Sequence, residues 1–274
     1  MLLHNLLFGI NIYNDSFGYR GYTSYLYSYK DIIIRLFHIV TRMTDNEPLL
    51  GGFWFLKSLF IGSIIGYLGL RYLSKRLYLL ELSLLIIVSL GFWQNLSVPY
   101  FQIGAKDVFA ALFFVLGYHC KRNNILTLVG IHNHIHIPFI IVTILLITLG
   151  THYWQGTVKV NMWWKVVPYT ATAILGTISV YILSLSLRKI FIIKKFLVYV
   201  GNHTMDILIW HMIAFKIVSF VIIKIYCLDI RRLAEHPAIE EYAMETWWSA
   251  YLIVGVFAPL LLSKIVEKWE VVKK

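Results

Sequence analysis

The chain has 274 residues, of which 59% are hydrophobic and only 14% are charged, and its formal net charge is +11. Soluble domains carry about 25% charged residues, so this composition excludes a soluble protein and indicates an integral membrane protein. The basic residues occur in short clusters between apolar runs, which is the pattern of cytoplasmic loops. We therefore assign the positive charge to membrane orientation and exclude nucleic acid as a partner.

The apolar runs predict the fold. A membrane-spanning helix needs about 20 largely apolar residues. Seven runs approach this length: Phe53–Leu70, Leu77–Leu96, Ile103–Tyr118, Ile137–Tyr153, Val167–Leu187, Thr204–Tyr226 and Ser249–Ile265. An earlier run, Leu2–Tyr13, is too short to cross alone and reads as the second half of a span. We predict an all-α polytopic membrane helix bundle, with about seven full spans plus a partial N-terminal one, in a single domain over residues 1–274.

Charges between the spans predict the orientation. Basic clusters follow the first, third and fifth full spans and close the chain, so they share one side, which we assign to the cytoplasm together with the C-terminus. The segment Asn14–Gly51 is then an outer loop, and we expect its stretch Asp31–Val40 to form a short helix lying in the membrane interface. The second long outer loop, Leu228–Thr246, is acidic and is expected to hold a helix or two.

Several ionisable residues lie inside the predicted spans, where a charge costs roughly 2.5–3.5 kcal/mol on insertion scales. Most of them have a structural explanation. Lys57 is near enough to a membrane surface to reach it along its side chain. Glu81 is expected to pair with Arg76, and Asp107 with groups on other helices.

No metal site is expected. His132, His134 and His136 form an alternating run, which on a strand would place the three rings on one face. However, no cysteine or carboxylate lies close in sequence, and the run precedes Pro138 at a helix start. The two cysteines, Cys120 and Cys227, likewise indicate no disulfide framework.

The stretch YVGNHTMDILIWHM (Tyr199–Met212) concentrates polar groups in an apolar segment. Asn202, Asp206 and Trp210 are spaced four residues apart and so share one face of a predicted helix, while His211 points elsewhere. One interpretation is structural: a helix cap at the start, and a hydrogen bond from His211 to a neighbouring helix. The other is that His211 takes part in function.

Three motifs follow one another along the chain: GGFWFLKSLF (Gly51–Phe60), AALFFVLGYHCKR (Ala110–Arg122) and VGNHTMDILIWHM (Val200–Met212). In this order they resemble the motifs of the acyltransferase 3 family of integral-membrane O-acyltransferases. In the third, Thr204 occupies the position of a family serine and His211 that of the terminal histidine. The motifs run from Gly51 onward.

The resemblance implies an enzyme of the bacterial inner membrane. It would move an acyl group, an acetyl group by preference, from acyl-CoA to a hydroxyl of a sugar or envelope glycan. The lipid bilayer, acyl-CoA and the glycan would be its partners, and it would use no bound cofactor. The resemblance makes His211 an auxiliary catalytic residue, and Trp54, Asn202 and Asp206 are candidate substrate-binding residues.

The resemblance also implies a difference from the family. Family members begin with further spans that carry a catalytic histidine and an arginine motif, and neither motif occurs in this sequence. The chain is therefore expected to be N-terminally truncated relative to the family and inactive by itself. Two alternatives remain open, namely an inactive truncated paralogue and a membrane transporter or flippase of envelope precursors.

Overall fold

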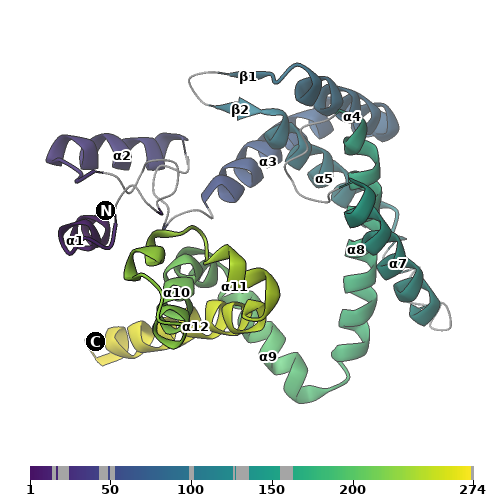
Figure 1. Cartoon of the computed structure of the whole chain (residues 1–274). Helices are drawn as coiled ribbons and strands as arrows, with labels where there is room; N and C mark the ends of the chain where they lie inside the picture. Colours follow the sequence, from purple (N-terminus) through teal and green to yellow (C-terminus); the bar gives the residue numbers. More distant parts are fainter. Residues whose placement is uncertain are drawn as a thin grey trace. The chain divides into compact units, whose positions relative to one another are not determined.

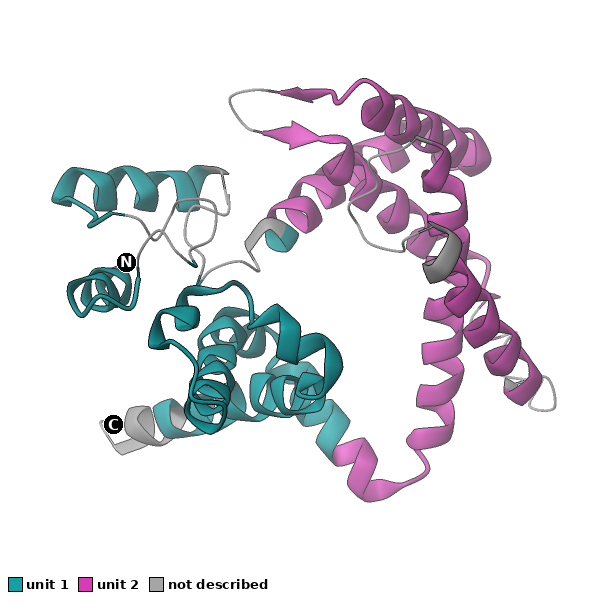
Figure 2. Cartoon of the chain, viewed as in Figure 1, with its two compact units in different colours: residues 1–56, 196–274 teal, residues 57–195 magenta. Residues whose placement is uncertain are grey.

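The computed structural model describes residues 1–13, 17, 25–42, 49, 53–98, 102–125, 127, 136–154 and 163–272. These residues divide into two compact units (Figure 2). Unit 1 comprises Met1–Leu56 and Phe196–Lys274, and unit 2 comprises Lys57–Lys195. The described residues are mostly helical (Figure 1), as the predicted fold class requires.

Unit 2 contains the first group of long apolar helices. The chain passes in order through α3 (Phe53–Leu73, whose first residues belong to unit 1), η2 (Ser74–Arg76), α4 (Leu77–Trp93), β1 (Ser97–Val98), β2 (Ile103–Gly104), α5 (Ala105–Arg122), α7 (His136–Trp154), η4 (Trp163–Lys165) and α8 (Val166–Leu187). Helix α9 (Phe191–Asn202) then leads into unit 1.

The core of unit 2 forms where α4 packs against α5 and α8, while α7 packs against α8. Leu84 and Val88 of α4 meet Leu112 and Val115 of α5, and all four side chains are buried. These residues recur at spacings of three and four, so each pair lies on a single helix face. The remaining faces of these helices are apolar and exposed, as expected of surfaces that contact lipid.

A short antiparallel ribbon lies between α4 and α5. Strand β1 pairs with β2, with Ser97 opposite Gly104 and Val98 opposite Ile103. The ribbon ends where α5 begins, because the Asp107 carboxylate accepts a hydrogen bond of 2.8 Å from the Gly104 N–H and caps the helix. Helix α5 therefore starts at Ala105 instead of Ile103.

Unit 1 contains both ends of the chain. Its elements are α1 (Leu2–Gly9), α2 (Tyr29–Arg42), α10 (Thr204–Ile225), η5 (Ile230–Ala234), α11 (Glu240–Glu245) and α12 (Trp248–Val272). Helices α10 and α12 make the most extensive helix contact in the described chain, and η5 and α11 pack on them. The predicted outer loop Leu228–Thr246 thus holds two short helices, as expected.

A close approach joins α10 to α12. The ring of Phe215 lies where a side chain at Gly255 would begin, since a Cβ built on Gly255 would be 2.5 Å from Phe215 Cε1. Val218 and Ile222 continue the buried face of α10, and Tyr251 lies opposite on α12.

Four helical stretches of the described residues are long and apolar enough to cross a membrane: Phe55–Trp93, Val166–Leu187, Thr204–Ile225 and Trp248–Val266. The first contains two predicted spans, α3 and α4, separated by η2. The predicted spans at residues 137–153 and 103–118 are helices as well, but the apolar part of the former is shorter, Ile137–Gly150. The count of seven full spans and a partial one stays a prediction.

The contact between α3 and α5 generates a prediction. A Cβ on Gly62 would lie 2.6 Å from Ala110 Cβ and 2.8 Å from the backbone nitrogen of Ala111. The backbone at Ala111 cannot move aside without shifting α5. We therefore expect Gly62→Ala to destabilise the protein by about 1–3 kcal/mol through overpacking. Thermal unfolding in detergent micelles measures the change.

Gly117→Ala is the matched control. Gly117 lies on α5, the partner helix of this contact, and a Cβ there would meet no heavy atom within 4 Å. Alanine favours a helix interior over glycine by about 1 kcal/mol, so this variant should be at least as stable as the parent. Equal stability of the Gly62→Ala variant and the parent would contradict the close α3–α5 contact.

Candidate functional site

The polar stretch Tyr199–Met212 is divided between two helices, α9 and α10. Asn202 is the last residue of α9, His203 lies in the turn, and α10 begins at Thr204. Asn202 and Asp206 therefore do not share the single continuous helix that their spacing predicts. The break agrees with the predicted span Thr204–Tyr226 and with the structural interpretation, which placed a helix start there. The His203 ring bonds locally to the Tyr199 carbonyl at 2.9 Å.

Asp206 lies in the first turn of α10, half-buried, and Asn202 is exposed. A carboxylate in a first turn is favoured by the partial positive charge of the helix N-terminus. Among the described side chains, neither residue is hydrogen-bonded to the other or to His211. The backbone of Trp54 lies in α3, but its side chain falls outside the described residues.

His211 has a defined ring orientation on α10. Its Nδ1 lies 2.8 Å from the Leu208 carbonyl oxygen and 3.1 Å from that of Ile207. The ring also meets Phe215 edge to face, with centroids 5.5 Å apart. Because a carbonyl oxygen can only accept, Nδ1 carries the proton, so the neutral ring has its lone pair on Nε2. That nitrogen has no hydrogen-bond partner among the described residues, and it can accept a proton or a hydrogen bond.

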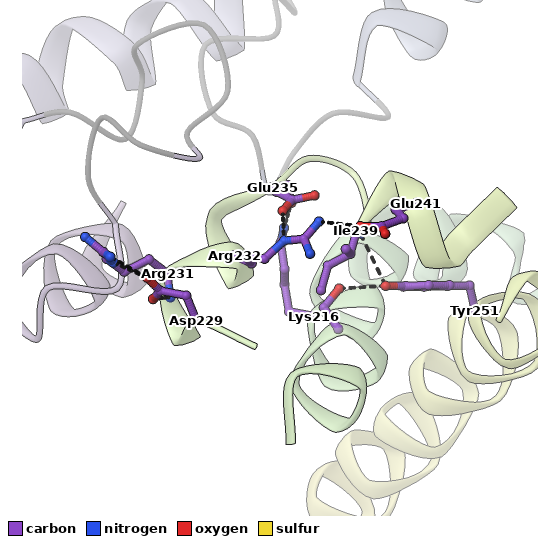
Figure 3. A network of polar contacts seen from close by, with 9 residues as sticks. Lys216, Asp229, Arg231, Arg232, Glu235, Ile239, Glu241 and Tyr251 are labelled. Atoms are coloured by element: carbon purple, nitrogen blue, oxygen red, sulfur yellow. Dashed lines mark hydrogen bonds and ion pairs between the residues drawn. The ribbon is translucent and has the colours of Figure 1, made fainter. Parts of the chain in front are cut away.

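A polar network joins α10 to the outer loop (Figure 3). Lys216 of α10 donates from its ammonium group to the carbonyl oxygen of Glu235. The Glu235 carboxylate accepts from Arg232 Nε at 2.6 Å, and Arg232 also reaches Glu241 at 3.3 Å. The hydrogen bond that Arg232 donates to the Glu235 carboxylate raises the pKa of the Arg232 guanidinium above its usual value. A lysine in an apolar helix is the signal that could have revealed this network, but its backbone partner could not be read from the sequence.

A second polar contact between elements of unit 1 involves Ser219, which follows Lys216 in α10. The hydroxyls of Ser219 on α10 and Tyr251 on α12 are hydrogen-bonded at 2.9 Å, and the backbone N–H of Ile239 donates to the Tyr251 oxygen at 3.3 Å. Because all three groups are buried, one phenol fixes two helices and the outer loop to one another.

In unit 2 the prediction that Asp107 pairs with another helix is confirmed. Its carboxylate accepts from Ser58 Oγ at 2.7 Å and lies 3.8 Å from Lys57 Nζ. Lys57 also donates to the carbonyl oxygen of Gln102, beyond the start of α5. The lysine thus reaches the end of the helix pair, as snorkelling requires.

The prediction that Glu81 pairs with Arg76 is wrong. Glu81 of α4 instead contacts His119 of α5, with Oε1 2.5 Å from Nδ1. Glu81 and Arg76 are five residues apart, and such residues do not lie on one helix face, whereas His119 projects from the helix packed alongside. The carboxylate orients the ring and leaves Nε2 on the opposite side. His119 is therefore a second histidine with a fixed orientation.

No group of three or more His, Cys, Asp or Glu side chains is placed to hold a metal ion within the described part of the chain. Of the alternating histidines, His132 and His134 lie outside the described residues, as does the side chain of His136.

The Tyr251 link gives a testable consequence. Tyr251→Phe removes the acceptor of the buried Ile239 N–H and the partner of Ser219. An unsatisfied buried polar group costs about 1–3 kcal/mol, so we expect a loss of stability of this size in detergent unfolding experiments. Tyr72→Phe is the control, since Tyr72 is 79% exposed and its change should stay within about 0.5 kcal/mol. Equal stability of the two variants would argue against the link.

Comparison with known proteins places the chain in a family. A search of curated proteins and a search of solved structures each found no match. The sequence model of the acyltransferase 3 family, described as an acyltransferase domain, matches residues 1–264. The match covers both units and includes α1 and α2, which precede the first of the three recognised motifs. The apolar helices agree with an integral membrane acyltransferase. The chain belongs to the acyltransferase 3 family.

Proposed function

We propose that the protein transfers an acyl group, by preference acetyl, from acyl-CoA to a hydroxyl of a sugar or envelope glycan. The family match over residues 1–264 is the observation that carries this proposal. The protein acts in the bacterial inner membrane with its C-terminus in the cytoplasm, where acyl-CoA is available. The positions of the basic clusters support this orientation.

The reaction requires one proton transfer. The acceptor oxygen forms an ester bond to the acyl carbon, the thioester C–S bond breaks, and the hydroxyl proton passes through a base to the leaving coenzyme A sulfur. An imidazole lone pair suits this task, because histidine exchanges protons near neutral pH.

We assign His211 an auxiliary role on the acceptor side. With its Nδ1 proton held by the Leu208 and Ile207 carbonyls, Nε2 is left to accept a hydrogen bond from the acceptor hydroxyl. Its contact with Phe215, which itself packs on Gly255 of α12, prevents the ring from turning freely. A fixed acceptor atom in an apolar surrounding is a suitable way to orient a hydroxyl.

The other substrate-binding residues in the proposal are Trp54, Asn202 and Asp206. Asn202 and Asp206 offer an amide and a carboxylate at the junction of α9 and α10, groups that bind sugar hydroxyls by donating and accepting hydrogen bonds. Trp54 offers an aromatic ring for the apolar face of a sugar.

His211→Ala tests the assignment. Loss of one hydrogen bond to the substrate is worth about 0.5–1.5 kcal/mol, so we expect kcat/KM for the acceptor to fall about 2- to 10-fold while the protein stays folded. The assay follows transfer of radiolabelled acetyl from acetyl-CoA in membranes, using the protein as its native cells make it. His203→Ala is the control, because that ring bonds to the backbone of its own helix turn and should leave transfer unchanged.

Normal transfer by a normally expressed His211→Ala protein would overturn the role of His211. Absence of any acetyl transfer by the parent protein would overturn the enzymatic proposal itself. Uptake of sugar into vesicles without transfer of the label would instead support the transporter alternative.

A further inference from the structure

Helix α2 (Tyr29–Arg42) is a separate amphipathic element outside the apolar spans. A reciprocal cap begins it, because the Asp31 carboxylate accepts from Ser28 Oγ at 2.7 Å and from the Ser28 N–H at 3.0 Å. These hydrogen bonds lower the pKa of the Asp31 carboxyl, so the cap persists at neutral pH. With 14 residues the helix is about 21 Å long, too short to cross a hydrocarbon core of about 30 Å.

Arg35, on the polar face of α2, points into the protein. Arg35 is only 9% exposed and donates to the Tyr25 hydroxyl. Its guanidinium lies over the ring of Tyr27, with Cζ 4.1 Å from the centroid. The ring of His4 in α1 stacks on the same tyrosine, with centroids 3.8 Å apart and planes only 5° from parallel. Arg35, Tyr27 and His4 form a buried stack that joins α2 to α1.

Backbone contacts reinforce this stack. Asn5 of α1 donates from Nδ2 to the Tyr27 carbonyl and accepts from the Tyr27 N–H, each at 3.0 Å. His4 Nε2 lies 3.2 Å from the Tyr25 carbonyl oxygen. Residues 25–27 are therefore fixed to α1 through their backbone. Because Arg35 contacts Tyr25 and Tyr27, these residues set the rotation of α2 about its axis.

The apolar face of α2 points outward. Ile33, Leu36, Phe37 and Val40 share this face at spacings of three and four residues, and they are 51% to 74% exposed. A helix of a soluble protein buries its apolar stripe, whereas α2 exposes this stripe and buries Arg35. A large apolar stripe in this position requires a partner.

We propose that α2 lies flat in the interface of the lipid bilayer, with its apolar face among the upper acyl chains and its Arg35 face held by the stack. The chain is a membrane protein, and only residues 43–52 separate α2 from α3, which begins an apolar stretch with exposed Phe55 and Phe60. Lys30, at the start of the helix, is exposed and can contact anionic headgroups.

Site-specific labelling of the full chain tests the proposal. Cys120 and Cys227 are replaced by Ser, and an environment-sensitive NBD label is attached in turn at Ile33→Cys, Val40→Cys, Thr41→Cys and His38→Cys. Each protein is reconstituted into liposomes of phosphatidylethanolamine and phosphatidylglycerol that contain lipid with a nitroxide at acyl carbon 5 or carbon 12. Ile33 and Val40 lie at the centre of the apolar face, Thr41 lies at its flank, and His38 lies on the opposite side.

We expect blue-shifted emission at positions 33 and 40, with strong quenching by nitroxide lipid, weaker quenching at 41 and the weakest at 38. Quenching by carbon 5 should exceed quenching by carbon 12, since interfacial helices sink only about 5–10 Å. Adding Arg35→Ala, which removes the guanidinium from the stack, should flatten the difference between the two faces.

Three results would overturn the proposal. Water-like emission at positions 33 and 40 would mean that nothing covers the face. Blue-shifted emission without lipid quenching would mean that protein covers it, and a disulfide between two Val40→Cys chains would identify a second copy. Stronger quenching by carbon 12 would mean deep insertion.

Discussion

The structure depends on the inability of lipid to hydrogen-bond with the chain. Backbone N–H and C=O groups in a bilayer must satisfy one another, which favours helices, and each charged side chain needs a partner nearby. The paired charges of the apolar helices follow this constraint. Lys57 and Ser58 meet Asp107, Glu81 meets His119, and Lys216 meets the Glu235 carbonyl.

These contacts also determine which helices are neighbours. Packing alone gives little directional preference between apolar helices in lipid, so small residues and polar pairs select the partners. Gly62 lets α3 approach Ala110 of α5, and the nearby Ser58–Asp107 hydrogen bond sets the register of the same two helices. In unit 1, Gly255 and Tyr251 have the corresponding roles between α12 and α10.

Against this background His211 differs from the paired groups Asp107, Glu81 and Lys216 of the apolar helices. Its Nδ1 is satisfied by its own helix, and Nε2 has no partner among the described residues. His119, by contrast, is paired with Glu81, which gives it a structural explanation. The difference supports a role for His211 toward a substrate in the proposed transfer reaction.

The sequence by itself determined the membrane class, the approximate positions of the long helices, and the family resemblance carried by the motifs. These follow from local composition and periodicity, which do not depend on distant contacts. Only the tertiary structure decided that Glu81 meets His119 instead of Arg76 and that Lys216 bonds to a loop carbonyl. Partners distant in the sequence decide these features. The same reason applies to α2: its sequence predicted an amphipathic helix, but only the stack on Tyr27 shows which face is turned outward.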